Sequence, residues 1–165
     1  MLNDNHDNES IEANLCHIYD IDDAEEAHKQ LDTEFVKGYG DETKLPDGTL
    51  LHYNSVWDDG YRVLLRCKHC GGMFLLQVST YTSMSDEGHD GHYTDYLPVW
   101  SEEEADLLNT LLGPGEFEDH PFRHLRGTNH KYCWYGKEQP HPMDIEELKR
   151  AISLKYKDKF HSSQT

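Results

Sequence analysis

Two thiols lie three positions apart at Cys67 and Cys70, in the stretch RCKHCGGMF of a chain with 165 residues and four cysteines. Apolar runs before and after this C-x-x-C pair predict strands on both sides, and Gly71 allows the backbone to curl so that both sulfurs point at one metal ion. This arrangement is that of a zinc knuckle. A redox pair of the thioredoxin type opens a helix, whereas Gly71 and Gly72 lead into strand residues. The sequence therefore favours metal ligands over redox chemistry, with a pair that holds no metal as the other alternative.

A structural zinc ion requires four ligands, and the knuckle supplies two. The candidates for the other two are His89 with His92, which complete C-x2-C-x18-H-x2-H, Cys133 with His130, and Cys16 with His17. The His89 and His92 pair meets a geometric difficulty, because a single strand of about ten residues after the knuckle carries the chain roughly 33 Å away. If the knuckle holds a metal, the sequence predicts one structural zinc ion with Cys67 and Cys70 as ligands and leaves its remaining ligands open.

The elements that must position these ligands follow from hydrophobic periodicity. Alternating or continuous apolar runs predict four consecutive antiparallel strands at 49–57, 61–67, 73–82 and 92–100, with Asp58, Asp59 and Gly60 as a tight hairpin turn between the first two. Apolar spacings of three and four predict helices at 11–18, 22–37, 101–112 and 144–160, the last two with capping boxes. Residues 116–141 are expected to be irregular. The fold class is α+β, a central meander of about four strands flanked by N-terminal, middle and C-terminal helices, in one domain over 11–160 with a disordered 1–10 and a frayed 161–165.

The net charge of -17 is unevenly distributed along the chain. Residues 1–34 carry eleven acidic side chains and one lysine, and residues 101–119 carry seven acidic side chains and no basic one. Such a field repels phosphate, so that direct binding to nucleic acid or to an anionic membrane is not expected, whereas a basic protein would be attracted. The start of the chain lacks the pattern of a signal peptide, and no apolar run reaches the length of a membrane span, which predicts a cytoplasmic protein with reduced thiols.

Aromatic residues stand beside several of these acids, a composition typical of protein-binding surfaces. The predicted partner-binding residues are Asp22, Asp23, Glu25, Glu26, Trp57, Asp58, Asp59, Glu102, Glu103 and Glu104. The chain contains no H-E-x-x-H, no phosphate-binding glycine loop and no nucleophile elbow, although it has twelve histidines. These features predict a binding protein rather than an enzyme, with a metal-dependent enzyme built on Cys67, Cys70 and some histidines as an alternative.

The run DDGYRVLLRCKHCGGMFLLQ, followed by YTDYLPV and SEEEADLL, resembles small bacterial proteins related to polymorphic-toxin immunity proteins. The resemblance covers about residues 58–108. It implies a sheet with a C-x-x-C-G turn and a protein that binds and blocks a cognate toxin, often a basic nuclease, without doing chemistry. A second interpretation is a mimic of DNA that inhibits a nucleic-acid-binding protein.

Overall fold

The computed structural model describes residues 15–39, 42–44, 50–52, 59–81, 91–113 and 116–163. Their elements are η1 (His17–Asp20), α2 (Ala24–Gln30), β1 (Thr33–Tyr39), β2 (Glu42–Lys44), β3 (Leu50–His52), β4 (Asp59–Cys67), β5 (Met73–Tyr81), β6 (Gly91–Val99), α3 (Glu102–Leu111), β7 (His124–Thr128), β8 (Lys131–Tyr135) and α4 (Ile145–Ser163). No helix among these residues is both long enough and apolar enough to span a bilayer.

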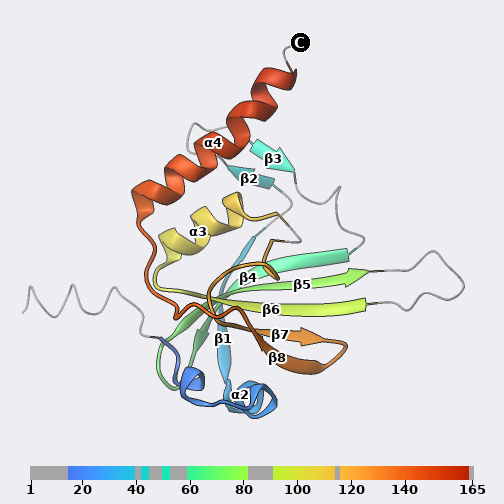
Figure 1. The fold of residues 1–165 in the computed structure, drawn as a ribbon, viewed down its shortest axis with the longest axis vertical. Helices are drawn as coiled ribbons and strands as arrows, with labels where there is room; N and C mark the ends of the chain where they lie inside the picture. The colour runs from blue at the N-terminus through green and yellow to red at the C-terminus, as the bar shows by residue number, and fades with distance from the viewer. Residues whose placement is uncertain are drawn as a thin grey trace, which may run out of the picture.

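The centre of the fold is an antiparallel sheet of six strands in the order β1-β4-β5-β6-β7-β8, which confirms the α+β class. The helices α3 and α4 cover one face, and η1 and α2 lie against the other (Figure 1). Successive strand residues point to opposite faces. Leu75 accordingly packs beneath α3 and α4, while its neighbour Phe74 packs against η1 and α2.

The sheet has more strands than the four predicted, and β1 replaces half of a predicted helix. The spacing of Ala24, Ala27, Leu31 and Phe35 fits a helical face, but the helix ends at Gln30 and residues 33–39 pair with β4. As a strand, residues 33–39 form backbone hydrogen bonds with β4 and place Val36 in the core beneath α3. Tertiary pairing therefore overrides the helical spacing in this segment.

The strands β7 and β8 arise within the stretch predicted to be irregular. Their buried positions include polar side chains, since His124 is 0% and Arg126 8% exposed, and these residues hide the usual alternation of apolar and polar residues. The two-residue turn between the strands has Asn129 and His130 at φ 51° and 72°. Both residues thus adopt the left-handed conformation that tight hairpin turns require.

The predicted hairpin turn at 58–60 is also corrected. Asp59 and Gly60 already belong to β4, opposite Thr80 and Ser79 of β5. Of the predicted strand 49–57, the described part is β3, which pairs with β2 in a separate small sheet rather than with β4. The turn residue Asp58 and its neighbour Trp57 lie outside the described residues.

Candidate metal centre

The turn that joins β4 to β5 presents the two thiols of the C-x-x-C pair. The N–H of Cys67 donates to the carbonyl of Gly72 at 2.7 Å, and the N–H of Gly71 donates to the carbonyl of Cys67 at 2.9 Å. Gly71 has a φ of 79°, the left-handed conformation in which a side chain would be strained. The residue types thus specify a closed turn with Cys67 and Cys70 at its two ends, as the knuckle interpretation predicts.

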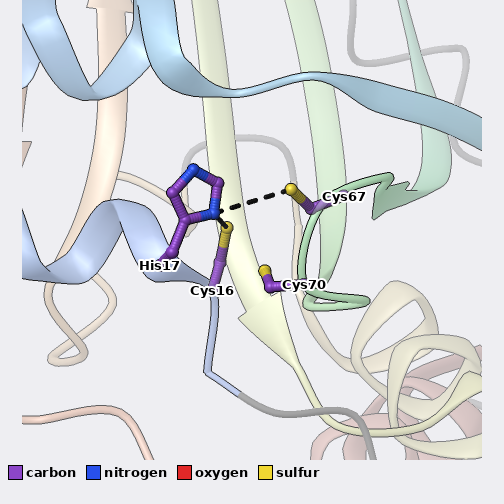
Figure 2. Close-up of side chains that lie close together, drawn as sticks. All are labelled: Cys16, His17, Cys67 and Cys70. Atoms are coloured by element: carbon purple, nitrogen blue, oxygen red, sulfur yellow. Dashed lines mark hydrogen bonds between the residues drawn. The ribbon is translucent and has the colours of Figure 1, made fainter.

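A second pair of ligand groups reaches this turn from the N-terminal segment. Cys16 and the first residue of η1, His17, come together with Cys67 and Cys70, so that one ligand atom from each lies within 4.8 Å of the others. His17 Nδ1 is 3.6 Å from the sulfur of Cys16 and 3.8 Å from that of Cys67 (Figure 2). All four cysteines of the chain are free thiols, and Cys16 and Cys67 are buried at 4% and 1% exposure.

The two separations from His17 Nδ1 match those of a tetrahedral zinc site. Zinc binds thiolate at about 2.3 Å and imidazole at about 2.0–2.1 Å, and tetrahedral angles then place neighbouring ligand atoms about 3.5–3.8 Å apart. Three sulfurs and one nitrogen also form one of the usual ligand sets for a structural zinc ion. An ion held by all four groups would have a closed coordination sphere, with no position for a reacting water or substrate.

Close backbone packing holds the N-terminal segment against the turn. A Cβ built on Gly72 would lie 2.8 Å from the Cα of Cys16, so that only glycine allows the two segments to approach this closely. The chain after α2 also joins the turn, because the N–H of Lys68 donates to the carbonyl of Asp32 at 2.8 Å. The β4–β5 turn therefore contacts two other segments, the start of η1 through the ligand cluster and the link between α2 and β1 through this backbone hydrogen bond.

The pKa values of two thiols in the cluster, Cys70 and Cys16, are shifted in opposite directions. Burial raises the pKa of Cys70, but hydrogen bonds from the His17 side chain and from the backbone of Gly72 and His17 lower the pKa to about 6. Burial raises the pKa of Cys16 instead. The lowered pKa of Cys70 favours its thiolate, which is the metal-binding form of cysteine.

Of the other predicted ligands, those that the structure describes do not join this cluster. His89 lies outside the described residues. His92 is opposite Thr80, whereas the strand start beside the knuckle, Met73, is opposite Val99, so that seven residues of β5, about 23 Å, separate them. The ring of His92 lies instead 5.5 Å from that of His130, at the turn between β7 and β8.

Cys133 is exposed and lies on the opposite side of the sheet from the cluster. It stands between Tyr132 and Trp134, which both pack on the η1 side, and alternation along β8 turns its own side chain away. Of the three pairs considered from the sequence, Cys16 with His17 is the one that the structure brings to the knuckle. The sequence does not select this pair, although Gly72, which packs against Cys16, indicates that some segment approaches the turn closely.

The predicted partner-binding acids fall on opposite sides of the sheet. Asp22, Asp23, Glu25 and Glu26 are exposed on and before α2, while Glu102 and Glu103 are exposed at the start of α3. Asp23 caps α2 by accepting from the N–H of Glu25 at 3.0 Å. The carboxylate of Glu25 accepts from the N–H of Tyr132 at 3.0 Å. These two acids therefore have structural contacts besides their charge.

The prediction that Glu104 belongs to the partner-binding surface is corrected, because its side chain is buried at 2% exposure. Its carboxylate accepts from the backbone N–H of Trp100 at 3.3 Å and from that of Met143 at 3.1 Å. Burial raises its pKa, and these two donors oppose that shift. Glu104 thus ties the start of α3 to the segment that leads into α4.

Comparison with known proteins identifies no family model, curated protein or solved structure that matches this chain.

Proposed function

We propose that this chain is a binding protein whose N-terminal acidic segment is fixed to the sheet by one structural zinc ion, and that its partner is a basic protein. The observation that carries the proposal is the cluster of Cys16, His17, Cys67 and Cys70, with ligand atoms within 4.8 Å of one another. The cluster has the ligand types and spacing of a closed zinc site and no position for catalysis.

The zinc ion would stabilise a segment that has little regular structure of its own. Residues 15–32 contain a four-residue 3-10 helix and a seven-residue α-helix, both too short to be stable without tertiary contacts. The segment also carries exposed acidic side chains on this side of the sheet. Its exposed acids are Asp20, Asp22, Asp23, Glu25, Glu26 and Asp32. The metal would therefore hold a charged surface in one defined geometry.

A basic toxin is the partner that this surface and the net charge of -17 favour. Acidic surfaces accelerate the encounter with basic proteins, and a cytoplasmic immunity protein must capture its nuclease quickly. The resemblance of residues 58–108 to immunity-type proteins supports the same proposal. Inhibition of a nucleic-acid-binding protein through mimicry of DNA is the second candidate, which the concentration of acids favours.

The zinc proposal predicts a stoichiometry near one ion per chain. Native mass spectrometry of protein purified without chelator should show one bound zinc ion, which is lost under denaturing conditions. Replacement by cobalt should give the visible absorption of a tetrahedral ion with thiolate ligands, because three of the four ligands are sulfurs. A metal-free mass, or a mass two protons lighter from a disulfide, would refute the zinc site.

The partner proposal predicts that charge reversal on the η1 side slows association more than reversal near α3. The first variant combines Asp20→Lys with Asp22→Lys, and its control combines Glu102→Lys with Glu103→Lys. Both change the net charge by the same amount. The first variant leaves the structural contacts of Asp23 and Glu25 intact. We expect the first pair to lower the association rate about tenfold at low salt, with a much smaller effect in 1 M salt.

The measurement uses the basic protein that the immobilised wild-type chain retains from a lysate of its own cells, identified and then purified. Equal slowing by both pairs would mean that only overall charge matters. Unchanged rates for both pairs would remove the acidic surface from the explanation.

A further inference from the structure

One part of the sheet face on the η1 side extends beyond the cluster around η1 and α2 and borders it at Tyr96. We call it the open sheet face, and it consists of Phe35, Tyr61, Val63, Leu65, Val78 and Tyr96. Phe35 is 66% and Tyr61 52% exposed, and Val63, Leu65, Val78 and Tyr96 are half-buried. An apolar surface on four adjacent strands is unusual for a free surface, and such patches mark interaction sites.

Strand pairing makes this face continuous. Phe35 lies opposite Leu65, Tyr61 lies opposite Val78, and all four side chains point to the side of Cys67 and Phe74. The described side chains that point to the side of Cys67 and Phe74 are uncharged in three stretches, which are residues 61–67, 74–78 and 94–98. The face is therefore an uncharged and partly aromatic surface on a chain with a net charge of -17.

The open sheet face adjoins the acidic segment. His28 of α2 packs edge-on against Tyr96, with ring centroids 6.1 Å apart, so that α2 borders the face directly. The six exposed acids of residues 20–32 lie on this same side of the sheet. An apolar centre beside a charged rim is the usual anatomy of a protein–protein interface.

We infer that the open sheet face is the docking surface for a basic protein, which contributes apolar side chains to Phe35 and Tyr61 while its cationic groups meet the acids of residues 20–32. This inference rests on the proposed function and names its interface. A second copy of the chain fits less well, because a symmetric contact through this face would bring the acids of two chains together. A basic partner meets no such repulsion.

Site-specific crosslinking tests the inference on the full chain. p-Benzoylphenylalanine is placed at Tyr61 or, as a matched control, at Leu154, which is 68% exposed on α4. The crosslinker at position 61 should capture the basic protein that the wild type retains from native lysate, and at position 154 it should not. With that protein purified, Phe35→Ser and Tyr61→Ser should each speed its dissociation at least about tenfold, and Leu154→Ser should not.

The outcomes separate the interface from the function. If the wild type retains a basic protein that Phe35→Ser and Tyr61→Ser hold as long as the wild type does, the open sheet face is refuted while the proposed function stands. Retention of no basic protein would refute both. Sedimentation of the holoprotein as a dimer that Tyr61→Ser dissociates would show that a second copy covers the face, which would also overturn the inference.

Discussion

Cys67→Ser should remove the bound zinc ion and lower the free energy of unfolding by several kcal/mol. Serine keeps the size of the side chain but does not supply a thiolate, so that the ion loses a ligand buried at 1% exposure. Zinc binding to structural sites contributes about 10–16 kcal/mol, as much as the whole stability of many domains. We expect the melting temperature to fall by on the order of 10 °C, since about 1 kcal/mol corresponds to about 2–4 °C in a chain of this size.

The matched control is Cys133→Ser. This cysteine is exposed and lies outside the ligand cluster, so that its replacement should change neither the zinc content nor the unfolding transition. Elemental analysis and urea unfolding of both variants, with and without added zinc, provide the measurements. A Cys67→Ser variant that keeps one equivalent of zinc with wild-type stability would contradict the assignment of Cys67 as a ligand.

The sequence could predict half of the ligand cluster because the residues of that half are close to one another in the chain. Cys67, Cys70 and Gly71 lie in one turn, and a C-x-x-C-G between apolar strands is sufficient to recognise it. Cys16 lies about fifty positions earlier, and its approach depends on the packing of η1 and α2 against Phe74. No spacing rule connects the two pairs, which is why three candidate pairs remained open until the fold was known.

The fold was predictable where one face of an element is apolar throughout. Ser101 accepts from the N–H of Glu104 at 3.1 Å, and Asp144 accepts from that of Glu147 at 3.1 Å, as the capping sequences of α3 and α4 indicate. The central strands β4, β5 and β6 were recognised for the same reason. The sequence does not reveal β1 and β7, because β1 carries an exposed Phe35 and β7 carries a buried Arg126, which binds Asp95 at 3.2 Å. In both strands the observed burial is the reverse of what the residue type suggests, because an aromatic side chain is exposed and a charged one is buried.

Gly72→Ala should weaken zinc binding although it removes no ligand. The added Cβ would lie 2.8 Å from both the Cα and the Cβ of Cys16, and since backbone cannot yield as the end of a side chain does, the N-terminal segment must move. Cys16 and His17 would then lose their positions opposite Cys67 and Cys70. We expect the zinc affinity to fall on the order of 10- to 100-fold, as when groups that orient metal ligands are replaced.

Gly71→Ala provides the matched control, because its Cβ would meet no atom within 4 Å and only the φ of 79° would be strained. That strain is about 1–2 kcal/mol in stability, without displacement of Cys16. Competition with a chromophoric chelator measures the zinc affinity of both variants, and of each in a Cys16→Ser background. In that background Gly72→Ala should add little, because the ligand that it displaces is already absent. Equal zinc affinity for Gly72→Ala and Gly71→Ala would show that the N-terminal segment does not contribute ligands, and the acidic surface of residues 20–32 would then be held to the sheet by apolar packing alone.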